Sequence, residues 1–164
     1  MTCKHNIYFE IYLLKIFNKY FPKIMADNLT PEKRTKIMKS ITSDGTKPEL
    51  VLRKFLFSHG YRYRKNYKKL PGRPDIVFIR RKIAIFVHGC FWHQHKSCKI
   101  TNKPSSNTVF WRDKFSKNLK RDERNQQDLK KMGWRPEVIW ECEILDTNRN
   151  TRDLNPILNK LNLI

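Results

Sequence analysis

The fold of this chain follows from one stretch of sequence, residues 70 to 88, which reads LPGRPDIVFIRRKIAIFVH. It contains two apolar runs, Ile76 to Ile79 and Ile83 to Val87, separated by a basic turn. Short runs of this kind are typical of strands that are buried on both faces, in sheets covered by helices on either side. A rigid turn, Leu70 to Pro74, leads into the first run at Asp75. The stretch therefore predicts two neighbouring buried strands at the centre of a sheet.

Helices and further strands are predicted around this centre from apolar periodicity, helix caps and turn residues. Before the central stretch we predict a helix from Thr30 to about Ser40, a helix carrying Val51, Leu52, Phe55 and Leu56 that ends at His59-Gly60, and an edge strand from Tyr61 to Arg64. After it we predict a loop from Lys99 to Thr108 and a helix from Trp111 to Met132 with Trp111, Phe115 and Leu119 on its apolar face. The chain then forms a strand from Trp134 to Trp140 and a short helix that packs through Leu154, Ile157, Leu158 and Leu161. We predict a single α/β domain over residues 26–164, with a central mixed β-sheet flanked by helices. Residues 1–25 would be an N-terminal extension or the product of an upstream start codon.

The net charge points to a polyanionic partner. The chain has 35 Lys and Arg against 15 Asp and Glu, a formal charge of +20. Each cation that neutralises a phosphate releases a condensed counterion, so this excess favours binding to nucleic acid. A ribosomal-type RNA-binding protein or a membrane-surface protein would carry a similar excess, and charge alone leaves these alternatives open.

The sequence predicts an intracellular protein. Its apolar runs have the length of strands rather than the ~20 residues of a membrane-spanning helix. The segment Ile7 to Phe21 resembles a signal peptide, but Glu10, Lys15 and Lys19 interrupt it, and no small-residue cleavage site follows. Paired disulfides would be unusual in an intracellular protein, so the four cysteines need another explanation.

A cluster of cysteines and histidines has the composition of a metal site. Its members are Cys90, His93, His95, Cys98 and Cys142. Zinc prefers four thiolate or imidazole ligands in a tetrahedron, and three cysteines with one histidine would leave no open position. Such a site would be structural and would join the loop after residue 88 to the strand that ends at Trp140. Spacing leaves open which histidine binds, and buried free thiols with surface histidines are the alternative. Cys3 is far from the cluster and is interpreted as incidental.

A second group of residues has the composition of a nuclease site. Phosphodiester cleavage needs a carboxylate that binds Mg²⁺, a base that activates water and charge stabilisation for the leaving oxygen. Asp75 opens a buried strand, at a sheet margin that metal and phosphate can reach, although a turn-capping role is equally compatible with its position. His88 and His93 flank the loop beyond the next strand. Two histidines beside a metal loop in a basic protein favour a functional role.

Two further carboxylates have both a functional and a structural interpretation. Glu49 is the third residue of a helix that opens with Thr46-Lys47-Pro48-Glu49, which is the pattern of a capping box. Asp122 lies on the long predicted helix where its apolar face breaks, four residues after Asn118. Asp122 therefore either faces the core, where its carboxylate needs a polar partner, or is solvated and needs none.

Several of these segments together resemble the very short patch repair endonucleases. The matching segments are LPGRPD at residues 70–75, VHGCFWHQH at residues 87–95, Asn118 to Asp122, and Trp140-Glu141-Cys142. They follow the order of the family, cover roughly Met25 to Glu143, and include the highly specific run Gly-Cys-Phe-Trp-His. The resemblance implies the fold of type II restriction enzymes, without their usual PD-(D/E)xK signature. It also implies an endonuclease that cuts the T strand beside a T:G mismatch left by deamination of 5-methylcytosine.

The resemblance implies roles for individual residues in the reaction. Asp75 is the implied Mg²⁺ ligand, together with the main-chain carbonyl of Val87, which stands where some members carry threonine. His93 is the implied water-activating group, with Glu49 close to it. His88 would help to position the water and the phosphates.

The same resemblance implies a partner for His88, a ligand set for zinc and a way of contacting DNA. The partner of His88 is Asp122. The implied structural zinc ligands are Cys90, His95, Cys98 and Cys142, which selects His95 over His93, although one extra residue lies between His95 and Cys98. The implied wedges into the DNA stack are Phe91, Trp92 and Trp111, with Met38 of the first helix approaching the minor groove. A mismatched step is cheaper to unstack, so such wedges would turn local weakness into recognition.

The expected partner is therefore double-stranded DNA that contains a T:G mismatch. We expect a monomer that acts in the bacterial cytoplasm and is associated with the nucleoid through DNA binding. Recruitment of other repair proteins is compatible with this role. Two alternatives remain at this level. One is a restriction-type endonuclease without mismatch preference, and the other is a zinc-stabilised DNA-binding protein without catalysis. The second alternative explains the charge and the cysteines but gives Asp75, His88 and His93 no purpose.

Overall fold

The computed structural model describes residues 45–96, 98, 101 and 104–163, together with Thr30 and Glu32. The chain divides into two compact units, one of residues 1–43 with 104–106 and one of residues 44–103 with 107–164. The second unit carries the sheet. The predicted N-terminal extension, Cys3, Met38 and most of the helix from Thr30 to Ser40 lie outside the described residues, so the predicted domain boundary stays a prediction. Glu32 is helical, as predicted.

Helix α3 spans Lys47–Ser58 and buries one apolar face. Leu52 and Leu56, one turn apart, are completely shielded from solvent. The helix ends directly before the predicted His59-Gly60 pair, where Gly60 has a φ angle of +82°. Glycine adopts that left-handed conformation without steric cost, so it stops the helix cleanly.

In the part of the chain that the structure describes, four strands form one mixed sheet. They are β1 (Arg64–Lys65), β2 (Ile76–Phe78), β3 (Ile83–His88) and β4 (Arg135–Trp140), and they lie in that order. The pairs β1–β2 and β2–β3 are antiparallel, whereas β3 and β4 are parallel. The expectation of an α/β unit with a central mixed sheet is therefore confirmed.

Two strand boundaries differ from the sequence prediction. The predicted edge strand from Tyr61 to Arg64 is shifted, since β1 pairs only through Arg64 and Lys65 with the three-residue strand β2. Ile79, predicted inside a buried strand, lies beyond the end of β2 and is 44% exposed. It belongs to the turn between β2 and β3, where the Lys82 amide donates to the Ile79 carbonyl. Apolar character alone did not distinguish this turn residue from the strand.

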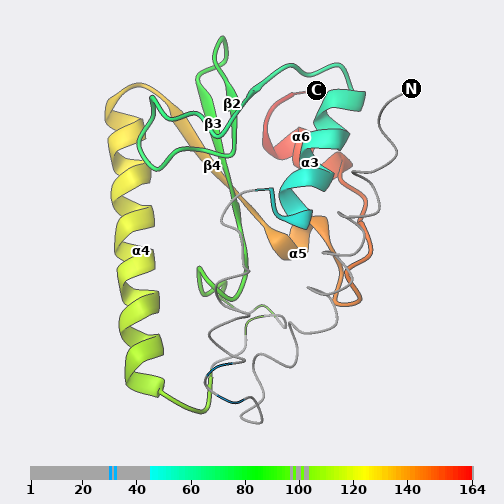
Figure 1. Ribbon diagram of the computed structural model, residues 1–164. Helices are drawn as coiled ribbons and strands as arrows, with labels where there is room; N and C mark the ends of the chain where they lie inside the picture. The colour runs from blue at the N-terminus through cyan, green and yellow to red at the C-terminus, as the bar shows by residue number, and fades with distance from the viewer. Residues whose placement is uncertain are drawn as a thin grey trace, which may run out of the picture. The chain divides into compact units, whose positions relative to one another are not determined.

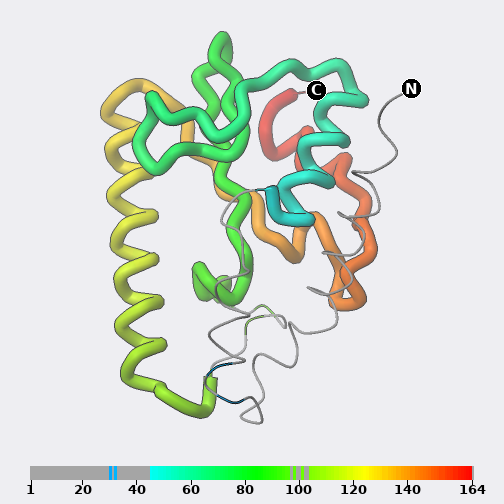
Figure 2. Tube along the Cα trace, viewed as in Figure 1, coloured from blue at the N-terminus to red at the C-terminus, as the bar shows by residue number. Residues whose placement is uncertain are grey.

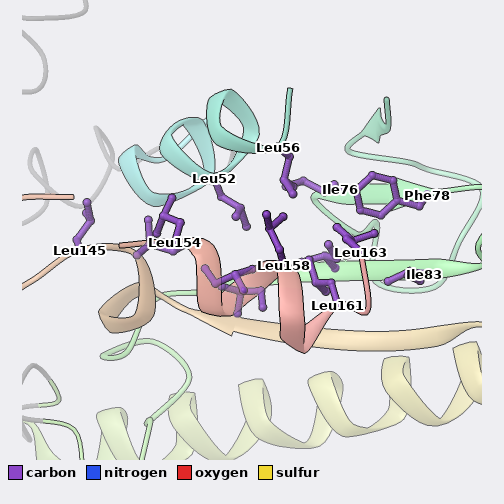
Figure 3. Close-up of a cluster of buried hydrophobic side chains, with 14 residues drawn as sticks. Leu52, Leu56, Ile76, Phe78, Ile83, Leu145, Leu154, Leu158, Leu161 and Leu163 are labelled. Atoms are coloured by element: carbon purple, nitrogen blue, oxygen red, sulfur yellow. The ribbon is translucent and has the colours of Figure 1, made fainter. Parts of the chain in front are cut away.

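The two faces of the sheet are covered by different elements, as Figure 1 shows. On one face the side chains pack against α3 and α6 (Asn155–Lys160), and Figure 3 shows this cluster. On the other face a smaller cluster is formed with the C-terminal half of α4 (Thr108–Lys131). The members of this smaller cluster are Leu70, Val77, Ala84, Phe86 and Leu129. Successive strand residues alternate between the two clusters, so both faces are buried as the apolar runs predicted.

Helix α4 begins at Thr108, three residues before the predicted start, and has 24 residues. Its buried residues are Phe115, Asn118 and Leu129. The prediction that Leu119 belongs to the apolar face was wrong, because this side chain is 48% exposed. The adjacent Asn118 takes the inward position instead, and its amide donates to the Trp92 carbonyl at 3.0 Å. Helix α4 therefore uses a polar contact at the point where an apolar one was expected.

The segment between β1 and β2 lies beside α4, in the same region as the C-terminal half of that helix (Figure 2). A Cβ atom added at Gly72 would come within 2.7 Å of the Asn125 side chain, so the turn approaches the helix closely. Gly72 also has a φ angle of +72°. Both constraints require glycine here. The turn that leads into Asp75 is thereby fixed between the sheet and α4.

The chain closes with α5 (Glu141–Ile144) and α6. Cys142, predicted at the end of a strand, lies in the first turn of α5, because β4 ends at Trp140. Among the described helices, none combines the length and the apolar composition that crossing a lipid bilayer requires.

Candidate active site and metal centre

The loop that follows β3 is folded on itself by main-chain hydrogen bonds. The amide of His93 donates to the Gly89 carbonyl at 3.2 Å, and the amide of His95 donates to the Cys90 carbonyl at 3.0 Å. Gln94 lies between them in the left-handed region, with a φ angle of +48°. This compact turn directs neighbouring histidines to different places, so that each one joins a different cluster.

The first cluster consists of His88, His93 and Asp122, whose potential ligand atoms all lie within 4.8 Å of one another. The rings of His88 and His93 are stacked, with centroids 3.7 Å apart and planes inclined by 14°. His93 Nδ1 lies 2.5 Å from Asp122 Oδ2, which is a short hydrogen bond. The end of β3, the following loop and α4 therefore meet at these three side chains.

This geometry corrects the predicted pairing of His88 with Asp122. The hydrogen bond to Asp122 comes from His93, and His88 reaches the carboxylate only as a stacked neighbour of that ring. The side chain of His88 is buried at the end of β3, where it also packs edge-on against Trp140. Sequence spacing could not rank the two histidines, because the choice depends on how α4 lies against the loop.

The protonation states of this cluster follow from burial and neighbouring charges. The pKa of His88 is lowered to about 3, mainly by burial and also by the nearby His93, while Asp122 opposes the shift. His88 is therefore neutral at physiological pH. Burial raises the pKa of Asp122, but hydrogen bonds from His93 and Arg121 outweigh that effect, and the net shift is downward. An ionised carboxylate only accepts hydrogen bonds, so His93 Nδ1 carries the shared proton and Nε2 faces away from Asp122.

Asp75 lies at the start of β2, one strand away from this cluster. Its carboxylate Oδ2 accepts a hydrogen bond from the Val87 amide at 2.7 Å, and Val87 immediately precedes His88. The Asp75 amide donates to the Ile85 carbonyl at 2.9 Å. The half-buried carboxylate is thus held against the end of β3. Carboxylate and main-chain oxygens are the ligand type that Mg²⁺ prefers.

Glu49 is 3% exposed and forms the predicted capping box of α3. Its Oε1 accepts from the Thr46 hydroxyl at 2.8 Å, and its Oε2 accepts from the Gly45 amide at 3.0 Å. Arg53 lies 3.2 Å from Oε2. These contacts give Glu49 a structural role, worth about 1 kcal/mol for the cap alone. No contact between Glu49 and His93 is present among the described residues, so its predicted place near His93 stays a prediction.

The second cluster consists of Cys90, His95, Cys98 and Cys142, and these four side chains could hold a metal ion. His95 Nδ1 lies 3.3 Å from Cys142 Sγ and 3.7 Å from Cys90 Sγ. Burial raises the pKa of the Cys90 thiol and of the Cys142 thiol, so a bound cation would have to supply the charge that stabilises both thiolates. The structure places His95, and not His93, beside the cysteines.

An ion pair between the buried Glu141 and the half-buried Arg149 lies beside the second cluster and was missed in the sequence. Glu141 accepts a hydrogen bond from the Cys90 amide at 3.4 Å and pairs with Arg149 through its other oxygen. The ring of His95 is stacked on Trp140, with centroids 4.1 Å apart. Trp140 therefore packs against one candidate ligand, and Glu141 binds the main chain of another. The segment Trp140-Glu141-Cys142 was noticed for its cysteine, whereas the acid beside it carried no separate signal.

An aromatic cluster lies next to these sites. Its members are Phe91, Trp92, Trp111 and Phe115, whose ring centroids lie 5.1–6.0 Å apart where they touch. Trp92 and Trp111 are half-buried and present part of their rings to solvent. Phe91 is 3% exposed and packs against the other three rings. In this structure Phe91 is a packing residue, which its position in the sequence did not show.

These features define a strongly basic α/β protein with a candidate metal centre and a histidine–aspartate cluster, suited to hydrolysis of a polyanion. The model of the family "DNA mismatch endonuclease Vsr" matches residues 26–99. The DNA mismatch endonuclease Vsr of Escherichia coli K12 is 39% identical over 73% of this chain and 76% of its own length. The chain belongs to the Vsr family and is a DNA endonuclease, a hydrolase of phosphodiester bonds.

Other relatives carry a related name. The type II nicking enzyme V.NmeAIP of Neisseria meningitidis serogroup A is 49% identical over 73% of this chain and 85% of its own length. The type II nicking enzyme V.XorIIP of Xanthomonas oryzae pv. oryzae is 44% identical over 82% of this chain and 98% of its own length. The resemblance drawn from the sequence motifs is therefore confirmed at the level of the family.

Proposed function

We propose that this endonuclease nicks the T strand at T:G mismatches that arise when 5-methylcytosine deaminates, and that the reaction depends on Mg²⁺. One structural observation carries the proposal. The Asp75 carboxylate is bonded to the amide of Val87, one residue before His88, and His88 is stacked on His93. The carboxylate that we propose as the Mg²⁺ ligand and the imidazole that we propose as the base therefore lie at the same end of β3. The E. coli relative, named a DNA mismatch endonuclease, supports the choice of substrate.

Asp75 and the main-chain carbonyl of Val87 would hold Mg²⁺, which when bound polarises the phosphate and stabilises the leaving oxygen. His93 is the proposed base. Because its Nδ1 hydrogen-bonds Asp122, the neutral ring offers the Nε2 lone pair to a proton of the attacking water. Asp122 fixes the orientation of the ring and stabilises the imidazolium that forms. His88, neutral and buried, limits the motion of His93 by stacking and offers a hydrogen-bonding ring to water or phosphate.

The proposed metal of the second cluster is Zn²⁺, and the cluster fits it. Three thiols and one imidazole provide the soft and borderline ligands that zinc selects, and four such ligands complete a tetrahedron. We assign the ion a structural role, since no ligand position would remain for substrate. It would join the loop after β3 to α5 and thereby fix the loop that carries His93.

The aromatic cluster is the proposed means of mismatch recognition. Trp92 and Trp111 are partly exposed, so they can enter a locally unstacked step without unfolding the cluster. In its buried position Phe91 would support the two tryptophan rings rather than enter the DNA itself. Met38 is assigned to the minor groove only through the family resemblance. The same resemblance leads us to infer the fold of type II restriction enzymes. The proposed enzyme acts as a monomer, and recruitment of other repair proteins is compatible with this role.

A second candidate function is nicking without mismatch preference, and the relatives that are named type II nicking enzymes, without mention of a mismatch, are the reason to test it. The two functions are separated by measuring cleavage of T:G duplexes and T:A duplexes that share the same flanking sequences, over a panel of such sequences. The proposal expects Mg²⁺-dependent nicks in the T strand of T:G duplexes and little cleavage of T:A duplexes. Equal cleavage of both would select the second candidate.

A further inference from the structure

Arg53 is a buried cation on α3 that neither the sequence motifs nor the family resemblance singled out. Arg53 is 9% exposed, and it belongs to the buried side of α3 together with Leu52 and Leu56. Removing a guanidinium group from water is costly unless it is paired and hydrogen-bonded. The contacts of Arg53 should therefore show what the burial serves.

A single nitrogen of Arg53 contacts three different segments. Its Nη2 lies 3.2 Å from Glu49 Oε2, donates to Asn66 Oδ1 at 2.8 Å, and donates to the main-chain carbonyl of Asp75 at 3.2 Å. Glu49 is on the preceding turn of α3, Asn66 follows β1, and Asp75 precedes β2. Arg53 thus connects the capping box of α3 directly to the main chain of the proposed Mg²⁺ ligand.

Asn66 extends this connection. Its main-chain amide donates to the same Asp75 carbonyl at 3.2 Å, so that carbonyl accepts from both Asn66 and Arg53. Asn66 adopts a φ angle of +47°, an unusual conformation that asparagine tolerates. On the opposite side, the amide and the carboxylate of Asp75 are bonded to Ile85 and Val87 of β3. Asp75 is therefore held from both sides, by β3 and by the Arg53–Asn66 pair.

We propose that Arg53, supported by Glu49 and Asn66, is a positioning residue that sets the main-chain geometry of Asp75 and thereby the affinity of the active site for Mg²⁺. This inference rests on the proposed role of Asp75. Arg53 contacts the main chain of Asp75 and would act on the metal site through it. It also explains the buried position of Glu49, whose carboxylate compensates the charge of Arg53 while it caps α3. Residues that orient metal ligands affect metal affinity or activity about 10- to 100-fold when they are replaced.

The test compares Arg53→Met with Arg135→Met. Arg135 is a suitable control because its guanidinium also anchors main chain, donating to the Leu161 carbonyl and lying 3.3 Å from the Glu137 carboxylate. It pairs with Ile83, at the far end of β3 from Val87. Both variants should lose stability, but only Arg53→Met should disturb Asp75. A third variant, Asn66→Gly, removes the Oδ1 acceptor and keeps a residue that tolerates the positive φ angle.

Two measurements are needed, and the first requires no metal. In amide hydrogen exchange without Mg²⁺, the main-chain amides of Val87 and Asn66 should exchange at least about tenfold faster in Arg53→Met, relative to the amides of α4, because both amides donate to Asp75. Arg135→Met should leave this ratio unchanged. In nicking assays, the Mg²⁺ concentration at half-maximal rate should rise about 10- to 100-fold for Arg53→Met. Asn66→Gly should shift both quantities in the same direction by a smaller factor.

The inference is overturned if Arg53→Met and Arg135→Met change the exchange ratio and the Mg²⁺ requirement equally, since Arg53 would then only stabilise the fold. Should Arg53→Met fail to fold, Asn66→Gly decides, and wild-type exchange at Val87 with a wild-type Mg²⁺ requirement counts against the inference. Failure of the proposed function itself is recognised separately. In that case Asp75→Asn nicks at the wild-type rate, whatever the exchange data show.

Discussion

His93 Nδ1 and Asp122 Oδ2 lie 2.5 Å apart, so a hydrogen bond joins the loop after β3 to the middle of α4. One turn earlier on the same helix, the Asn118 amide donates to the Trp92 carbonyl at 3.0 Å. Two consecutive loop residues are thus held by two polar residues on one face of α4. The helix serves as a rigid support for the histidine that we propose as the base, and this relationship leads to the first prediction.

Replacing Asp122 with Asn should reduce both nicking and stability at neutral pH. Asn can donate to His93 Nδ1 or accept from it, so the ring is no longer held in one tautomer, and we expect nicking to fall at least about 100-fold. The pKa of Asp122 lies below its ordinary value of 3.8, so the ionised form stabilises the native state. This contribution is fully present above pH 3.8 and is lost as the pH falls through the lower native value.

Urea unfolding of wild type and Asp122→Asn, measured from pH 7 down to pH 3, checks this linkage. The difference in unfolding free energy should be constant at neutral pH and should shrink in the most acidic samples. Glu123→Gln is a suitable control, since it changes an exposed carboxylate on the next residue of α4. A difference that stays constant across the whole pH range would show that Asp122 does not stabilise the fold through its charge.

Asp75→Asn should abolish nicking while leaving affinity for DNA nearly unchanged. The substitution removes the negative charge that we assign to Mg²⁺ binding, but it removes none of the cations that contact phosphates. Asn can still accept the Val87 amide through its side-chain oxygen, so the end of β3 should keep its geometry. Nicking rates at saturating Mg²⁺ and DNA affinities by fluorescence anisotropy provide the comparison. Wild-type rates for the variant would remove Asp75 from the proposed site.

Chelating the metal of the second cluster should destabilise the protein. Metal analysis should find about one zinc ion per chain, and Cys142→Ser should lower the melting temperature sharply because ligand binding is coupled to folding. Cys3→Ser is the natural control, since that residue was assigned no partner in the sequence. If protein purified without chelators contains no zinc and Cys142→Ser melts like wild type, the four residues are only neighbouring thiols and an imidazole.

Much of the fold and part of the site could be predicted from the sequence, and the reasons differ. The strands β2 and β3 were visible because apolar runs between turn residues report burial directly. The break in the apolar face of α4 indicated that Asp122 is either solvated or faces the core with a partner. It could not show that the partner is His93, because the contact spans 29 positions of sequence and depends on the rotation of the helix.

For other residues the sequence gave no indication of their structural role. Arg53 has the sequence context of an ordinary surface cation, and only the approach of Asn66 and Asp75 in three dimensions makes it a buried one. Glu141 was likewise hidden beside Cys142 until the Cys90 amide and Arg149 were placed next to it. In each case the missing information was tertiary, since single-residue propensities describe a helix face but not what packs against it.

The last prediction is that Trp92→Ala loses discrimination of T:G mismatches more than it loses general affinity for DNA. Stacking of a base on an aromatic ring is worth ~1–3 kcal/mol, and only a weakened step should admit the ring cheaply. General affinity should instead depend on the excess of Lys and Arg and should fall steeply with salt. The comparison is affinity for T:G and T:A duplexes at two salt concentrations, for wild type and variant. A wedge reduces the T:G advantage and leaves the salt dependence nearly constant.

The control for this experiment is Phe115→Leu, which alters the same aromatic cluster at a buried ring on α4. If Trp92 serves only to pack, both variants should lose stability and should weaken T:G and T:A binding together, and circular dichroism must show that each variant is folded. A folded Trp92→Ala that keeps its full T:G preference would transfer the wedge role to Trp111, the other partly exposed ring of the cluster. The double variant with Trp111→Ala would then be decisive, because mismatch preference that survives the loss of both rings cannot come from aromatic wedging by this cluster.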